Sequence, residues 1–159
     1  MIAEAGHYAL VLALALALIQ STVPMVGARG GDHALMNVAR STALAQLLFV
    51  AASLAALVTL YIVSDFSVVN VFENSHSTKP LLYKITGVWG NHEGSMLLWV
   101  SILALFGGLV AAFGNNLPLL LRAHVLAVQG WIASAFYLFI LVTSNPFLRI
   151  ASPPIEGRD

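Results

Sequence analysis

Residues 6–28 read GHYALVLALALALIQSTVPMVGA, a mostly apolar run that contains no Asp, Glu, Lys or Arg. Three further stretches also lack these charged residues: 41–64, 94–121 and 123–148. Each is long enough to cross a bilayer core about 30 Å thick, which takes about 20 helical residues. Only helices and closed barrels satisfy every backbone group there, and the apolar runs do not alternate with polar residues as barrel strands do. The sequence therefore predicts an all-α, polytopic membrane bundle of four transmembrane helices.

The composition supports a membrane protein and excludes several classes of function. Of the 159 residues, 59% are hydrophobic and only 9% are charged, whereas a soluble domain has about a quarter charged residues. Seven basic and seven acidic residues cancel, so no basic field attracts nucleic acid. The chain has no cysteine, which excludes disulfides and thiolate chemistry within it. We therefore expect partners in the membrane or at its surface, lipid included.

The chain is predicted to form a single membrane domain over residues 1–159. The helices are expected at about 6–28, 41–64, 93–114 and 122–144. Residues 65–91 then form the longest loop. The segment Asn145-Pro146-Phe147 stops the fourth helix, which leaves 145–159 as an extended connector.

The basic residues predict the orientation of these helices. Arg29 and Arg40 bracket the first short connection and Arg122 closes the third, and short basic connections stay on the cytoplasmic side. Arginines in the tail count against this orientation. On balance the amino terminus is predicted outside, so that the loop 65–91 and the connector 145–159 are extracytoplasmic.

One segment departs from plain membrane-helix composition. Residues 84–99 read KITGVWGNHEGSMLLW, with amide, imidazole, carboxylate and hydroxyl groups between two indoles at a membrane boundary. Asn91 is a suitable N-cap and Glu93 suits the first turn of a helix that begins near His92. In such a helix, Ser95, Met96 and Trp99 share one face with His92.

This segment has two interpretations. In the first, the indoles are interfacial anchors and the polar groups form a solvated helix start. In the second, the face is an outer-leaflet docking surface for a flat, partly apolar ligand, with indoles for stacking and a histidine for an axial bond or a propionate contact. The candidate haem-facing or apocytochrome-facing residues are Trp89, Asn91, His92, Glu93 and Trp99. No metal-binding signature is present, and no catalytic residue can be assigned.

The remaining polar residues give weaker signals. His7 and His76 fall on the same predicted side as the motif, and His33 and His124 on the opposite side. None of the four is favoured as a ligand, and His124, close to Arg122, is most simply an interfacial residue. Gln46, within the second span, can hydrogen-bond across helices. No charged residue lies in the middle of a span, which disfavours a proton-coupled transporter.

Three parts of the sequence carry a resemblance to a known family. They are residues 83–99, the opening residues 4–9 (EAGHYA), and Asn145-Pro146-Phe147 followed by Pro153-Pro154. Together they resemble the amino-terminal part of CcmF/CycK/NrfE-type cytochrome c maturation haem lyase subunits. The resemblance implies a multi-pass protein of the bacterial cytoplasmic membrane, and a longer native chain.

The resemblance also implies a function. Such proteins join haem vinyl groups to the cysteines of apocytochrome c, accept haem from a periplasmic haem chaperone and work with other maturation subunits. The chain is thus expected to support haem attachment at the outer face of the membrane, without being active alone. The family's best-known haem-ligating histidines follow the region matched here, so haem is implied only through the complete protein. The alternatives are a noncatalytic four-helix scaffold and a transporter subunit.

Overall fold

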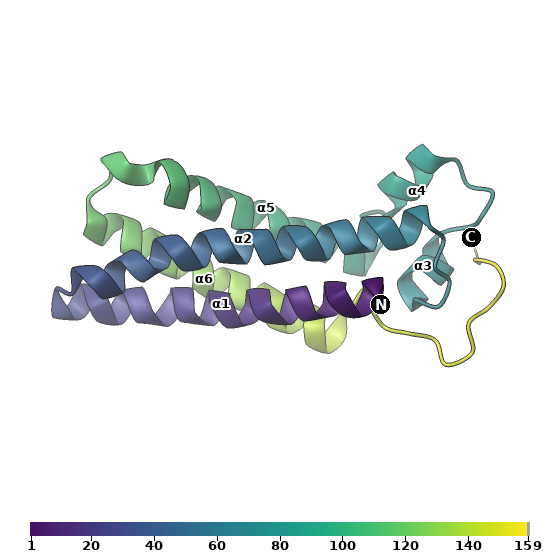
Figure 1. The fold of residues 1–159 in the computed structure, drawn as a ribbon, viewed down its shortest axis with the longest axis horizontal. Coiled ribbons are helices and arrows are strands. Elements are labelled where there is room, and N and C mark those ends of the chain that lie inside the picture. The colour runs from purple at the N-terminus through teal and green to yellow at the C-terminus, as the bar shows by residue number, and fades with distance from the viewer. Residues whose placement is uncertain (159) are drawn as a thin grey trace.

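The computed structural model describes residues 1–158, and four long helices form an elongated bundle (Figure 1). These helices are α1 (Ile2–Gly30), α2 (His33–Ile62), α5 (His92–Phe113) and α6 (Leu119–Thr143). Each is long and apolar enough to cross a membrane. Within the described residues there is no strand, only one isolated β-bridge. The predicted all-α bundle with four membrane-spanning helices is confirmed.

The first two helices are longer than the charge-free runs that predicted them. Helix α1 includes Glu4 in its first turn and Arg29 in its last turn, where each charge suits the helix dipole. Helix α2 begins at His33 instead of 41, because the Asp32 carboxylate caps it by accepting from the backbone amides of Ala34 and Leu35 at 2.8 and 3.2 Å. Charged residues at helix ends therefore lie within the helices, beyond the apolar part that crosses the membrane.

The last two long helices lie close to their predicted positions. Helix α5 spans His92–Phe113 against the predicted 93–114, and a short 3-10 helix, η1 (Gly114–Asn116), follows it. Helix α6 spans Leu119–Thr143 against the predicted 122–144. Pro118 precedes the first residue of α6, where a fixed φ and a missing amide hydrogen cost nothing.

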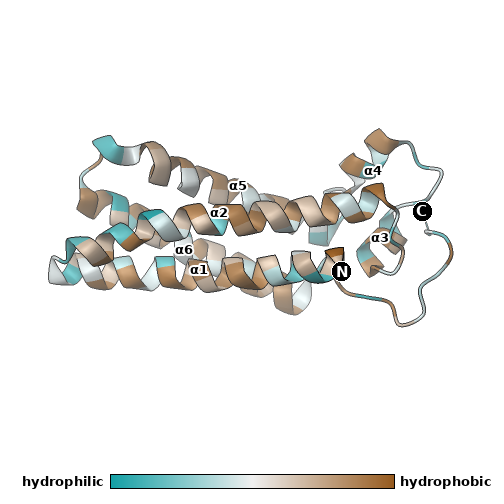
Figure 2. Ribbon diagram, in the orientation of Figure 1, coloured by the Kyte–Doolittle hydropathy of each residue, from teal (hydrophilic) through white to brown (hydrophobic). Residues whose placement is uncertain are grey.

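Small residues let the helices approach one another closely. Helix α1 packs along α2 and α6, and α5 packs against α2 and α6. At Gly130 a Cβ atom would lie 3.0 Å from the backbone oxygen of Ala17, so a larger residue would push the backbones of α1 and α6 apart by a few tenths of an ångström. Apolar residues cover the length of the bundle and polar residues gather toward its two ends (Figure 2).

Three buried glutamines join the helices inside the apolar bundle. Gln129 on α6 donates through Nε2 to Gln46 Oε1 on α2 at 3.2 Å, and Gln20 on α1 donates to Gln129 Oε1 and, at 2.7 Å, to the backbone oxygen of Leu126. The expected cross-helix bond of Gln46 is thus present. Its partners were not predicted, although amides in apolar spans are a readable signal.

The two ends of the bundle differ in construction (Figure 1). One end, here called the turn end, holds only the short connections 31–32 and 114–118. The other, the loop end, holds residues 63–91 with two short helices, α3 (Val69–Asn74) and α4 (Leu81–Gly87), together with residues 144–158. The amino terminus also lies at the loop end.

The segment after α6 is docked on the loop 65–91. The Val69 amide donates to Leu148 O at 2.9 Å, the Ile150 amide donates to Ser67 O at 2.9 Å, and the Arg158 amide donates to the backbone oxygen of residue 72 at 2.8 Å. The segment 145–158 is therefore held by the loop at two places, at residues 148–150 and at residues 156–158. Asp159 lies outside the described residues.

Candidate functional site

The motif singled out in the sequence forms the turn between α4 and α5 at the loop end. Helix α5 begins at His92, and Asn91 is its N-cap, with Oδ1 accepting from the Gly94 amide at 2.8 Å. The predicted cap is therefore present. A Cβ atom at Gly94 would lie 1.6 Å from the Val88 carbonyl oxygen, so the turn closes onto the helix start only because this residue is glycine.

The Asn91 side chain also ties this turn to α2. Its Nδ2 donates to the Tyr61 hydroxyl at 2.9 Å and to the carbonyl oxygens of Gly87 and Val88 at 3.1 and 3.2 Å. Tyr61 and Val88 are fully buried. A buried polar group needs its partners, because leaving one unpaired costs about 1–3 kcal/mol. The amide of Asn91 is therefore a structural group and not an open ligand.

Asn70 on α3 joins the same cluster. Its Nδ2 donates to Asn91 Oδ1 at 2.9 Å and to Glu93 Oε2 at 3.2 Å, while its Oδ1 accepts from the Tyr61 hydroxyl at 2.7 Å. These contacts connect α2, α3 and the start of α5. We call Tyr61, Asn70, Asn91 and Glu93 the loop-end network.

The other three candidates point outward. Trp89 is 40% exposed, Trp99 is 66% exposed and His92 is exposed. The imidazole of His92 lies edge-on against the Phe139 ring on α6, with centroids 6.3 Å apart. The residue is exposed, so a ligand can approach its ring, as an axial bond or a propionate contact requires. We call Trp89, His92 and Trp99 the outward residues.

The predicted helical face is partly present. Ser95 and Met96 are half-buried. The Ser95 hydroxyl donates to the His92 carbonyl oxygen at 2.9 Å, and Met96 packs against the core. His92 and Trp99 thus lie at the border between the bundle core and its outer surface.

The other loop-end histidines have partners of their own. His7 Nδ1 accepts from Asn145 Nδ2 at 3.2 Å, and His76 Nδ1 lies 3.0 Å from the Thr78 hydroxyl. The Phe147 amide donates to Asn145 Oδ1, which orients the Asn145 amide toward His7. Among residues 1–158 no three side chains of His, Cys, Asp or Glu form a group that could hold a metal ion.

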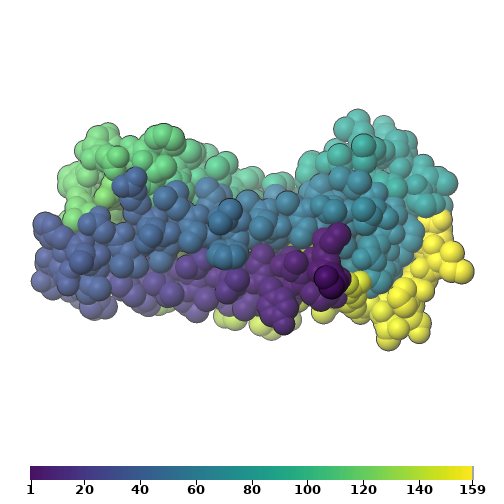
Figure 3. Space-filling view, viewed as in Figure 1, coloured from purple at the N-terminus to yellow at the C-terminus, as the bar shows by residue number. Residues whose placement is uncertain are grey.

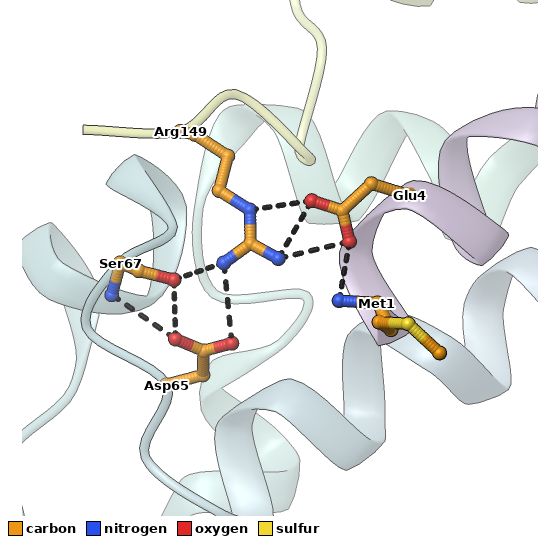
Figure 4. Close-up of polar contacts among 5 residues, drawn as sticks. All are labelled: Met1, Glu4, Asp65, Ser67 and Arg149. Carbon is orange, nitrogen blue, oxygen red and sulfur yellow. Dashed lines mark hydrogen bonds and ion pairs between the residues drawn. The ribbon is translucent and has the colours of Figure 1, made fainter. Parts of the chain in front are cut away.

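An ion-pair cluster that the sequence did not predict joins three parts of the loop end (Figure 4). Arg149, after α6, donates to the Glu4 carboxylate through Nε at 2.7 Å and Nη2 at 2.9 Å, and its Nη1 lies 3.6 Å from Asp65 Oδ2. Its Nη1 also donates to the Ser67 hydroxyl. The bidentate geometry with Glu4 is the stronger form of an arginine–carboxylate pair. A cavity of about 310 Å³ adjoins this cluster and includes His7 in its lining.

A second polar contact holds the end of the tail. Glu156 accepts from the Ser77 hydroxyl at 2.6 Å and from the Ser77 amide at 2.9 Å. These two hydrogen bonds are the main reason that the pKa of the Glu156 carboxyl is lowered to about 2. A hydrogen bond from the Gly157 amide and the nearby His76 ring lower it further. The tail is therefore held by charge-assisted contacts at both of its ends.

Another cavity lies away from this end, in a groove of about 620 Å³ between α2 and α5. Figure 3 shows a hollow in the surface between α4 and the carboxyl-terminal part of α5, which lies at the turn end. Its lining is almost entirely aliphatic, for example Leu54, Val58, Leu98 and Ile102. Such a lining offers hardly any polar group to orient a ligand, so the candidate site stays at the loop end.

This chain is similar over its whole length to known proteins. It is 86% identical over 159 residues to the cytochrome c-type biogenesis protein CycK of Bradyrhizobium diazoefficiens, and 47% identical over 160 residues to CcmF of Pseudomonas aeruginosa. This chain is a relative of the CcmF/CycK/NrfE-type proteins. The expected resemblance is confirmed. No family model matches the chain.

A solved structure supports the same relationship. The solved cytochrome c haem lyase CcmF matches 92% of the chain with a TM-score of 0.87 and 28% sequence identity. The chain spans about a quarter of the length of its CycK and CcmF relatives, 24% in both cases, and 25% of the solved CcmF chain. With four helices able to cross a membrane, it is a multi-pass membrane protein.

Proposed function

We propose that this chain is part of the haem lyase machinery of c-type cytochrome biogenesis and supports covalent attachment of haem to apocytochrome c. The observation that carries the proposal is the relationship over the full chain to proteins named for cytochrome c-type biogenesis, one of them a solved haem lyase. Formation of the thioether bond is not assigned to these residues. Their role is to supply a rigid bundle and a docking surface, in company with a haem chaperone, apocytochrome c and other maturation subunits.

The protein lies in the bacterial cytoplasmic membrane with the loop end outside. The charges of the two ends support this orientation. The turn end carries Arg29, Arg40 and Arg122 against one acidic residue, Asp32. The loop end mixes acidic and basic residues. Basic residues in short connections favour the cytoplasmic side.

Within the loop end, the outward residues form the surface that meets haem or the apocytochrome. Haem is a substrate here: a flat, apolar ring with charged propionates. Trp89 and Trp99 offer exposed indole faces for stacking, and His92 offers an imidazole that a ligand can approach. The loop-end network holds the start of α5 and thereby fixes the position of His92. The loop-end network thus serves as a fixed support, and the three outward residues are the side chains that recognise the ligand.

A second candidate is a noncatalytic scaffold that only assembles the maturation complex. It is favoured by the structural contacts of Asn91 and Glu93, which use two of the five candidate residues for folding. In this case Trp89 and Trp99 are membrane-interface anchors.

A pyridine haemochrome assay on the purified protein loaded with haem separates the two candidates. His92→Ala and Trp89→Ala are compared with His124→Ala and Trp131→Ala, matched exposed residues on α6. The docking surface predicts bound haem in the parent protein, a loss in the first two variants and no change in the controls. A parent protein without haem, or an equal loss in all four variants, would reject haem recognition by the outward residues and favour the scaffold.

A further inference from the structure

Helix α4 (Leu81–Gly87) exposes its apolar side chains although it belongs to the folded loop end. None of its residues is buried. Leu81 and Tyr83 are more than half exposed, and Leu82 is 68% exposed. Three consecutive large apolar side chains without cover are unusual on a water-facing surface, and such patches mark contacts with protein or membrane.

The position of α4 relates it to the membrane boundary. Helix α4 packs against α2 and lies beside the end where α2 stops at Ile62 (Figure 1). Lys84 Nζ donates to the Ser64 hydroxyl at 2.6 Å, which fixes α4 just beyond that end. The chain then turns and enters the membrane again at His92, the first residue of α5. Helix α4 is therefore level with the ends of two membrane-spanning helices.

The residue types on and beside α4 match a lipid interface better than a surface that faces water or another protein. Tyr83 and Trp89 are the amphipathic aromatics that gather where hydrocarbon meets headgroups. The only two lysines of the chain, Lys79 and Lys84, lie beside and within the helix, so this part of the loop end is locally basic. Ile62 and Val63 at the end of α2 are exposed too, so the apolar surface continues from the spanning helices toward α4.

We propose that α4 is an interfacial anchor, in which Leu81, Leu82 and Tyr83 insert among the upper acyl chains of phospholipids in the leaflet at the loop end. The anchor fixes the depth of Trp89 and of the turn into α5. The anchor requires only that the bundle spans a membrane, and it does not depend on haem recognition.

Spin labelling tests the anchor directly, because the chain has no native cysteine. Leu82→Cys and Leu81→Cys are labelled with a nitroxide in phospholipid nanodiscs, and Ile155→Cys, 99% exposed in the tail, is the control. Relaxation by oxygen, which concentrates in lipid, is compared with relaxation by a water-soluble nickel chelate. The two sites avoid disturbing the core, because neither side chain is buried.

The anchor predicts that oxygen relaxes the labels at 81 and 82 more than nickel does, and that nickel dominates at 155. Dominance of nickel at 81 and 82 would place α4 in water and overturn the proposal. Low relaxation by both agents at 81 and 82 would mean that protein covers α4, which would overturn it as well.

Discussion

Both ends of the bundle begin a helix with a polar N-cap, but they use it differently. At the turn end, Asp32 accepts from two backbone amides of α2 and the connection is otherwise exposed. At the loop end, Asn91 makes the same kind of cap and in addition binds Tyr61 and Asn70. The first cap is a local feature that only reverses the chain. The second joins three elements and presents exposed side chains on a fixed support, as functional loops commonly do.

The sharpest test of this difference replaces one glycine at each end. Gly94→Ala puts a Cβ atom 1.6 Å from a backbone oxygen, whereas at Gly30 no atom lies within 4 Å. We expect Gly94→Ala to destabilise the protein by more than about 4 kcal/mol, in the range reserved for severe steric conflict. Gly30→Ala should be neutral or slightly stabilising, since alanine is the better helix former. Thermal unfolding in detergent, followed by circular dichroism, measures both, and equal stability of the two variants would contradict the tight turn at 88–94.

The second test removes the two caps. Asp32→Ala should cost about 1 kcal/mol, the usual value for an N-cap. Asn91→Ala should cost about 3 kcal/mol, because it also removes the hydrogen bonds that the Asn91 side chain makes with Tyr61, with Asn70 and with the carbonyl oxygens of residues 87 and 88. The same unfolding measurement applies. A loss of stability in Asn91→Ala no larger than in Asp32→Ala would mean that the loop-end network adds no stability beyond that of the cap.

The third test concerns the docked tail. Arg149→Met removes the bidentate contact with Glu4 and the contact with Asp65. Arg122→Met at the turn end removes only hydrogen bonds to Asn115 and Asn37. Exposed ion pairs contribute about 1 kcal/mol or less, so global stability should barely change in either variant. Limited proteolysis should cut residues 150–158 faster in the Arg149 variant alone, and equal rates in both variants would show that Arg149 does not hold the tail.

The smallest expected effect is a pH dependence of the tail. The pKa of Glu156 is lowered from an ordinary 4.5 to about 2, mainly by hydrogen bonds from Ser77. A lowered pKa means that the charged carboxylate favours the docked state. Its contribution is complete above about pH 4.5 and is lost as the pH falls toward 2.

A fluorescent label at Ile155→Cys should therefore report tail release only in strong acid. Adding Ser77→Ala should move the onset of release to higher pH, since the carboxyl then loses the hydroxyl donor that is the largest cause of its lowered pKa, while the backbone amides of residues 77 and 157 still donate. Release curves that coincide with and without Ser77 would contradict this role. The turn end has no counterpart to this contact among the described hydrogen bonds and ion pairs.

The sequence predicts the parts of this fold that depend on local chemistry. Four apolar runs give four spanning helices, and Asn91 and Glu93 mark the start of α5. The helix bounds are less predictable, because α2 continues past charged Arg40 back to its cap at Asp32. Lack of charge indicates the membrane-crossing part of a helix, but not its ends.

The contacts of the loop end could not be predicted, because their partners are distant in sequence. Tyr61, Asn70 and Asn91 come from three elements, and nothing near any one of them specifies the other two. The pairing of residues 67–69 with 148–150 is equally nonlocal. The sequence thus singles out the candidate residues, but not which of them have structural contacts and which point outward.

The most direct test of the central claim, that the loop end is the functional end, is covalent haem attachment in cells. His92→Ala at the loop end and His124→Ala at the turn end are introduced into the full-length native protein, and c-type cytochromes are detected by haem staining on denaturing gels. We expect a strong loss of haem-stained cytochrome for His92→Ala, at unchanged protein level, and normal staining for His124→Ala. Normal staining for His92→Ala, or a loss confined to His124→Ala, would contradict it.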